Sequence, residues 1–107
     1  MKTKNRFQED GCLKEKVRHP KMYAVIYLND HITTADFVID SLMEIFNKDR
    51  RTAEKLTVEV DSLGQCIAGI YSKNIAETKK NEVLAMAKAR KMPFQVITEP
   101  VDDEEEE

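Results

Sequence analysis

Polar side chains gather between two apolar stretches of this 107-residue chain, in a segment that we call the polar elbow (residues 29–34). They are Asn29, Asp30, His31, Thr33 and Thr34. Amide, carboxylate, imidazole and hydroxyl groups in such a cluster can bind a polar ligand group, or they can form a turn and cap a helix. Thr33 followed by Asp36 is close to a capping box, so spacing alone leaves both interpretations open.

Other residues that could supply a nucleophile or a base are His19, Cys12 and Cys66. Cys66 lies in an apolar strand pattern, where a small buried thiol is common. Cys12 and His19 lie in a stretch without apolar periodicity, and the chain has no glycine-rich phosphate loop. We therefore expect no enzyme, no catalytic residue, no cofactor and no metal site.

The elbow must be positioned by the apolar segments on either side of it. Residues 22–28 are apolar on both alternating faces and rich in β-formers, which predicts a well-covered strand. After the elbow, apolar residues recur every three or four positions, which predicts a helix with one core-facing side. These residues are Ala35, Val38, Ile39, Leu42, Ile45 and Phe46.

The rest of the chain adds two helices and two strands. Asp49 can cap a second helix that ends at Leu63 and Gly64, because glycine adopts left-handed backbone angles at little cost. Residues 65–71 predict a short buried strand, residues 73–91 a helix capped by Ser72, and residues 94–98 a last strand. The predicted fold is α+β, a small sandwich in the order β-α-α-β-α-β, with three helices on one face of a three-stranded antiparallel sheet.

The length and charge of the chain limit the number of domains and the classes of partner that it can have. The chain is long enough for one domain, and no apolar run is long enough to span a membrane. Its net charge is −3 at pH 7 and no basic stripe is present, so we expect no nucleic-acid partner. We predict a flexible arm at residues 1–20, a core domain at 21–99 and a disordered acidic tail at 100–107, in a cytoplasmic monomer.

An ordered set of residues makes the sequence similar to the ClpS family, the adaptors of the Clp ATP-dependent protease. The set consists of Tyr23, Val25, Asn29, Asp30, Thr33, Phe37, Val38, Gly64, Gly69, Ala76, Glu77, Thr78, Lys79 and Pro93. The resemblance covers about residues 22–99 and implies the strand and helix order derived above. It also implies a non-enzymatic adaptor that binds N-degrons, which are substrates beginning with Leu, Phe, Tyr or Trp, and delivers them to an AAA+ unfoldase of the ClpA or ClpC type.

The resemblance further implies a role for particular residues. The α-amino group and first peptide unit would be bound by Asn29, Asp30, His31, Thr33 and Asp61. The apolar pocket would be formed by Ala35, Val38, Thr57, Val60 and Phe94, and the unfoldase would dock on Asn74, Glu77, Thr78 and Lys79. Capping or plain core packing remains the alternative for Thr33, Val38, Val60 and Phe94.

The sequence departs from the family pattern in several places. The family usually has Asn-Asp-Asp in the elbow and a histidine after the second helix, whereas this chain has His31 and Asp61. The exchange either keeps one carboxylate and one imidazole in the site or reflects independent drift. A gatekeeping methionine is replaced by Ala35, which implies that Ile and Val are better tolerated as first residues. A usual docking glutamate is Asn74.

A second function remains open at this point. The predicted fold also resembles the C-terminal domain of the ribosomal stalk protein, which docks translation factors through a helical face. The polar elbow has no purpose in that alternative.

Overall fold

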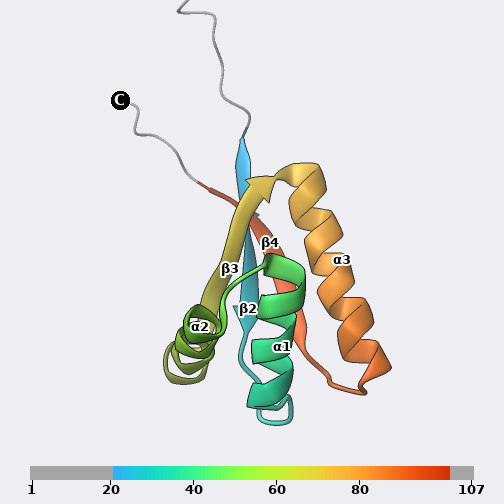
Figure 1. Cartoon of the computed structure of the whole chain (residues 1–107). Helices are drawn as coiled ribbons and strands as arrows, with labels where there is room; N and C mark the ends of the chain where they lie inside the picture. The colour runs from blue at the N-terminus through green and yellow to red at the C-terminus, as the bar shows by residue number, and fades with distance from the viewer. Residues whose placement is uncertain (1–20, 102–107) are drawn as a thin grey trace, which may run out of the picture.

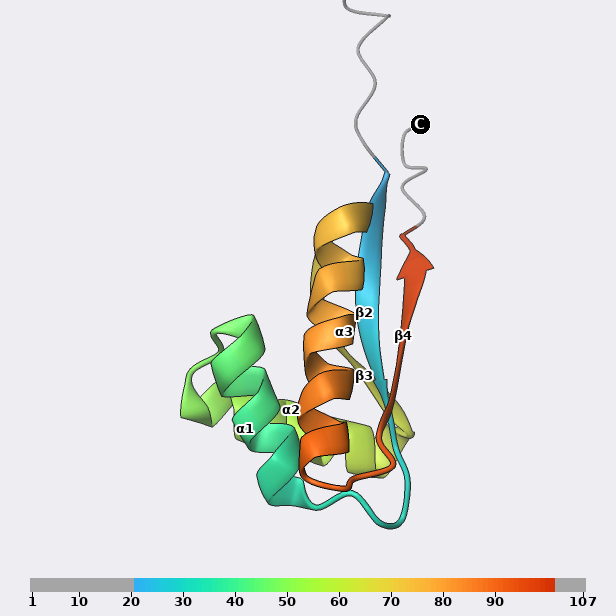
Figure 2. The same ribbon diagram turned by 90° about the vertical axis from the view of Figure 1, so that its right-hand side faces the viewer.

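The structure is a computed structural model, which describes residues 21–101. A central strand, β2 (Met22–Leu28), organises the fold. β3 (Gln65–Ser72) and β4 (Gln95–Pro100) pair with its two edges, both antiparallel, in the order β3-β2-β4. The helices are α1 (Ala35–Phe46), α2 (Arg50–Leu63) and α3 (Lys73–Ala89), and all three lie on the same side of the sheet (Figures 1 and 2). The predicted element order and fold class are confirmed.

The last strand extends beyond its predicted end. β4 continues to Pro100, and the backbone N–H of Val101 donates to the carbonyl oxygen of Met22 at 2.8 Å. The ladder therefore continues past Thr98, where the last strand was predicted to end. The arm predicted at residues 1–20 lies outside the described residues, and so do residues 102–107 of the tail predicted at residues 100–107.

The helices begin and end at residues that can form hydrogen bonds with the unpaired backbone groups at a helix terminus, or that can adopt the backbone angles needed there. Asp49 caps α2 and accepts from the N–H of Thr52 at 3.0 Å, and Gly64 ends the helix with φ of 89°. The cap of α1 is Thr34, whose hydroxyl accepts from the N–H of Phe37 at 3.2 Å. The suggested capping box of Thr33 and Asp36 is therefore wrong. Ser72 precedes α3 without a capping hydrogen bond from its side chain.

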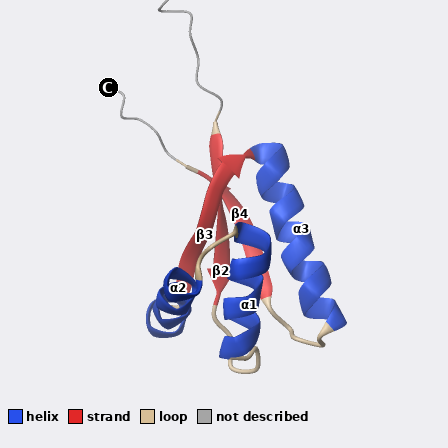
Figure 3. Cartoon of the chain, in the orientation of Figure 1, coloured by secondary structure: helices blue, strands red, loops and turns tan. Residues whose placement is uncertain are grey.

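The two faces of the sheet are covered unequally. Helices bury Val25 and Tyr27 completely on one face, whereas Ile67 and Ile70 on the other face are 48% and 46% exposed. The prediction of a buried β3 is therefore wrong for every outward position. Ile26 is only 6% exposed because it pairs with Ile67 on one side and Ile97 on the other. The strand colouring in Figure 3 shows how narrow this sheet is.

The buried side of α1 also differs from the predicted stripe. Its buried residues are Phe37, Val38, Ser41, Leu42 and Phe46, whereas Ala35 is exposed and Ile39 and Ile45 are partly buried. The core-facing side is thus turned by about one position from the prediction. This rotation places Phe37 inside and leaves Ala35 at the start of the helix, beside the elbow.

Aromatic rings fill the centre of the core under α1. The ring of Tyr27 packs edge-on against Phe94 at 4.8 Å and Phe46 at 5.8 Å between centroids. Tyr71 packs beside Phe46, and Gly69 leaves room for it, because a Cβ at position 69 would lie 2.5 Å from the Tyr71 hydroxyl oxygen. Burial of each large side chain contributes roughly 1.5–3 kcal/mol.

One buried polar contact crosses this core. The hydroxyl groups of Tyr27 and Ser41 lie 2.7 Å apart, and the Ser41 hydroxyl also donates to the carbonyl oxygen of Val38 at 2.9 Å. Since a hydroxyl has a single proton, Tyr27 must donate to Ser41. Burial raises the pKa of Tyr27, despite the hydrogen bond with Ser41, so this proton is held firmly.

The direction of this hydrogen bond predicts unequal effects of two matched substitutions. Tyr27→Phe removes the donor and leaves Ser41 bonded to Val38, so it should cost about 0.5–1.5 kcal/mol of unfolding free energy. Ser41→Ala leaves the buried Tyr27 hydroxyl without a hydrogen-bond acceptor and should cost more, about 1–3 kcal/mol. Urea denaturation followed by circular dichroism measures both values. Equal costs, or a larger cost for Tyr27→Phe, would contradict the assigned direction.

Candidate functional site

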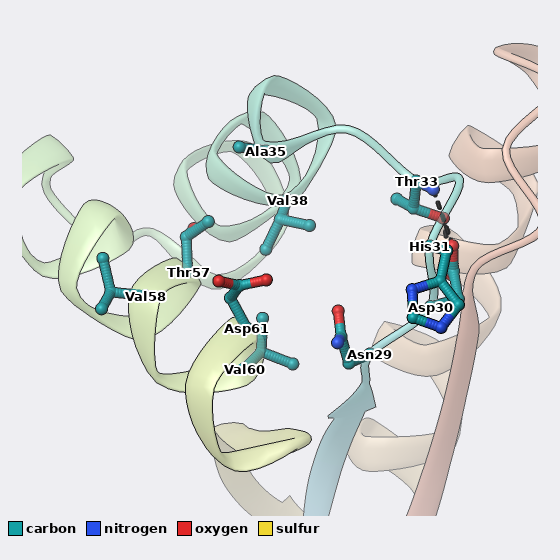
Figure 4. A pocket seen from close by; sticks show the side chains of 10 residues that line it. All are labelled: Asn29, Asp30, His31, Thr33, Ala35, Val38, Thr57, Val58, Val60 and Asp61. Carbon is teal, nitrogen blue, oxygen red and sulfur yellow. Dashed lines mark hydrogen bonds between the residues drawn. The ribbon is translucent and has the colours of Figure 1, made fainter.

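A cavity of about 460 Å³ opens where the polar elbow meets the start of α1 and the second half of α2 (Figure 4). This volume is within the usual range of small-ligand sites, roughly 300–1,000 Å³. The cavity is lined by Asn29, Asp30, His31, Thr33, Ala35, Val38, Thr57, Val58, Val60 and Asp61. Segments that lie about thirty residues apart in the sequence thus share one site.

The structure brings together nearly the whole predicted pocket and amine-binding set. Phe94 is the exception, because it is 5% exposed and packs between Tyr27 and Phe37 in the core, outside the described lining. Plain core packing, the alternative stated for Phe94, describes its position. Val58 lines the cavity but was not predicted. Its side chain is 66% exposed, and an apolar residue on an outward helix face was the only available signal.

One wall of the cavity is apolar. Val38 from α1 and Val60 from α2 are 4% and 3% exposed, and both lie at the junction of the cavity with the core. The hydroxyl of Thr57 donates to the carbonyl oxygen of Ala53 at 2.7 Å, so its polarity is satisfied within α2. This wall can therefore accept an apolar group without leaving a buried polar group that lacks a hydrogen-bond partner.

The elbow opposite this wall is held by a single carboxylate. One oxygen of Asp30 accepts from the backbone N–H groups of Ile32 at 2.8 Å and Thr33 at 2.6 Å. The other accepts from the Thr33 hydroxyl at 2.7 Å. Burial would raise the pKa of Asp30, but these hydrogen bonds lower it below its ordinary value. Asp30 is thus a structural anion that fixes the path of the chain into α1.

Two other polar side chains point into the open space of the cavity. Asn29 extends from the end of β2 and Asp61 from the last turn of α2, on opposite sides of the opening (Figure 4). The backbone N–H of Asn29 donates to the carbonyl oxygen of Gly64 at 3.0 Å, which ties the elbow to the end of α2. Within residues 21–101, the Asp61 carboxylate makes no hydrogen bond or ion pair of its own.

The four predicted docking residues lie along the first half of α3, away from the cavity (Figure 1). Asn74 and Thr78 are exposed, and the Thr78 hydroxyl donates to the carbonyl oxygen of Asn74. Glu77 accepts from the Thr98 hydroxyl at 2.7 Å and pairs with Lys80 at 3.1 Å. Lys79 is partly buried and donates to the carbonyl oxygen of Ile45 at 2.7 Å, so it braces the end of α1.

Across the described part of the chain, no group of three or more His, Cys, Asp or Glu side chains is arranged to hold a metal ion. None of the helices within that part combines the length and apolar character that crossing a bilayer requires.

Comparisons with known proteins agree on one family. The family described as "ATP-dependent Clp protease adaptor protein ClpS" matches residues 18–97. The ClpS adapter of Treponema denticola is 42% identical over 101 residues, which cover 94% of this chain and all of the relative. That of Clostridium acetobutylicum is 43% identical over 96 residues, covering 90% and 95%.

A solved structure shares the fold. ClpS2 of Agrobacterium tumefaciens, bound to L-phenylalaninamide, superposes with a TM-score of 0.75 at 30% identity. The match covers 78% of this chain and all of the other. These findings favour the predicted adaptor over the ribosomal-stalk alternative.

The hydrogen bonds of the elbow predict how Asp30 titrates. Because its pKa is lowered in the folded state, Asp30 contributes stability above the ordinary value near 3.8, and this contribution is lost as the pH falls through the lower folded value. Thr33→Val removes the hydroxyl donor, so the pKa of Asp30 should rise toward its ordinary value. Carboxyl-carbon NMR titration measures this change. Thr34→Val is the matched control, since that hydroxyl caps α1 and does not contact Asp30. An unchanged Asp30 titration in Thr33→Val would contradict this account of the elbow.

Proposed function

Because this chain belongs to the ClpS family, we propose that it is an adaptor that binds N-degron proteins, those beginning with Leu, Phe, Tyr or Trp, and delivers them to a Clp AAA+ unfoldase. Degradation by the Clp protease follows delivery. The proposal places this action in the cytoplasm and gives the chain itself no catalytic step.

A single observation carries the proposal, namely that the cavity joins an apolar wall to a polar one. Val38 and Val60 can cover a large apolar side chain, whose burial contributes roughly 1.5–3 kcal/mol. Asn29 and Asp61 face the same space and can accept hydrogen bonds from an α-ammonium group. A free N-terminal residue has both features at adjacent atoms, whereas an internal residue lacks the ammonium.

The ligand of the similar ClpS2 structure has the same combination of groups. L-phenylalaninamide, named in that structure's description, carries an aromatic side chain, a free amine and a first amide unit. By analogy, the side chain would enter between Val38, Thr57 and Val60. The amine and the amide would then lie against the elbow, near Asn29, His31 and Thr33.

The unfoldase would dock at the opposite end of the molecule from the substrate. Asn74, Glu77, Thr78 and Lys79 lie on the first half of α3, whereas the cavity lies at the far end of β2 (Figure 1). An unfoldase of the ClpA or ClpC type could then bind α3 without covering the cavity. Lys79 would stabilise this surface through its hydrogen bond to the carbonyl oxygen of Ile45, so its ammonium group would be only partly available to the unfoldase.

The first residue of a peptide is therefore expected to control binding. Peptides that differ only at this position should bind with Phe, Leu, Tyr or Trp, and should lose roughly 1.5–3 kcal/mol with Ser or Gly because little apolar area is buried. An N-acetylated Phe peptide, which lacks the ammonium, should also bind more weakly. Fluorescence anisotropy measures each affinity. Similar affinities across the series would reject the proposal.

Ala35 is expected to determine how β-branched first residues are treated. It is exposed at the rim of the cavity, where a longer side chain would approach the Cβ branch of a bound Ile or Val. Ala35→Met should weaken binding of Ile and Val peptides by about 1–2 kcal/mol while sparing Phe and Leu. The matched control is Ala85→Met, which changes an exposed alanine on α3. An equal effect of Ala35→Met on all four peptides would show that the rim does not discriminate.

A further inference from the structure

The face of the sheet opposite the helices is apolar, and no element within residues 21–101 covers it (Figure 2). Ile26 pairs with Ile67 on one side and with Ile97 on the other. Ala24 pairs with Ile70, and paired residues point out of the same side of a sheet. We call this surface the open face, and it consists of Met22, Ala24, Ile26, Ile67, Ile70 and Ile97. Four of these side chains are between 36% and 48% exposed.

The open face is large enough to bind a segment of chain but small for an independent complex. Three strands about 4.8 Å apart and about 23 Å long span roughly 330 Å². Two copies packed through this face would bury roughly 660 Å² together, about half of the 1,200 Å² or more of a stable interface. A segment of the same chain needs less area, because a short tether gives it an effective concentration on the order of millimolar.

Both ends of the described chain leave the sheet beside the open face. The backbone N–H of Val101 donates to the carbonyl oxygen of Met22 at 2.8 Å, so the start of β2 lies next to the end of β4. The six residues after Val101 are all acidic and offer no apolar group. The twenty residues before Lys21 include the apolar Leu13 and Val17 and carry six basic and three acidic side chains. Only the N-terminal segment therefore has the apolar groups that this face requires, and its positive charge is attracted to the acidic C-terminal residues.

The N-terminal segment is also long enough to reach across the open face. Ile26 lies five residues along β2 from Lys21, a distance of about 16 Å. Leu13 lies eight residues before Lys21, so it can extend about 26 Å from it. This reach exceeds the distance to Ile26 even after the chain has turned and moved away from the sheet by one packing layer of about 10 Å.

We propose that residues 13–20 turn back at Pro20 and bind the open face of the same chain. Proline presets a backbone angle that suits a turn. Leu13 then covers the row of isoleucines around Ile26, and Val17 covers the row nearer the start of β2. The contact lies on the opposite face of the sheet from the helices, so it goes beyond the proposed function and does not depend on it.

A nitroxide spin label on Cys12, next to Leu13, tests the proposal in the full-length, isotope-labelled chain. Cys66 is buried, and burial raises the pKa of its thiol to about 11, so that it stays protonated and reacts slowly. The label should remove most of the amide NMR intensity at Ile67, Ile70 and Ile97 and much less in α1 and α2. The same sample with the label reduced gives the reference intensities.

A variant that carries Leu13→Ser and Val17→Ser should recover the lost intensity, because the apolar contact is removed. The matched control carries Glu15→Ser and Lys16→Ser, which leave the net charge unchanged, and it should keep the loss seen in the wild-type chain. Without any label, amide shifts on the open face should differ between the wild-type chain and the first variant but not between the wild-type chain and the control.

Three results would overturn the proposal. The first is a loss of intensity confined to the residues next to Lys21, or equal in all elements, because the segment would then not bind the face. The second is an unchanged pattern in the variant with Leu13→Ser and Val17→Ser. The third comes from mixing spin-labelled protein with separate isotope-labelled protein: a loss at Ile67 and Ile97 in that mixture would assign the open face to a second copy of the chain.

Discussion

Three hydrogen bonds to one carboxylate determine how the site is built. The chain must leave the central strand, reverse and enter α1 within six residues, and Asp30 holds this path by binding two backbone N–H groups and one hydroxyl. Each hydrogen bond to a charged group contributes on the order of 1.5–3 kcal/mol where water is partly excluded, and less at an exposed site. Without this fixed path, Asn29 and Ala35 would not face the same cavity.

The other walls of the cavity depend on packing around the central strand. All three helices lie on one face of a narrow sheet, and the cavity lies between the elbow, the start of α1 and the second half of α2 (Figures 1 and 4). Tyr27 supports this arrangement from beneath, since it contacts Phe46 and Phe94 and donates to Ser41 of α1. The apolar wall of the site is thus the margin of the core, because Val38 and Val60 belong both to the core and to the cavity lining.

Local rules in the sequence predicted the order of elements and several helix ends. Asp49 and Gly64 act through nearest neighbours, so their capping roles follow from residue type alone. Thr33 and Thr34 were not separable in this way, because the outcome depends on which hydroxyl reaches Asp30. The exposure of Ile67 and Ile70 depends on how many layers the fold has, which β-propensity does not encode.

Positions carried over from the family located most of the cavity, but only the structure shows how its charges are used. Asp30 and Asp61 are alike as residue types, and their different situations arise from contacts made within the elbow. Lys79 similarly resembles a surface docking residue until its bond to Ile45 is seen.

The most direct test of this account is an amide NMR titration of the protein with L-phenylalaninamide. The account predicts that resonances of Asn29, Val38, Val60 and Asp61 move together with one saturable binding curve, while those of Ile67, Ile97 and the other residues on the open face of the sheet stay in place. Absence of saturable change at the cavity, or changes centred on the open face, would contradict the assignment of the site.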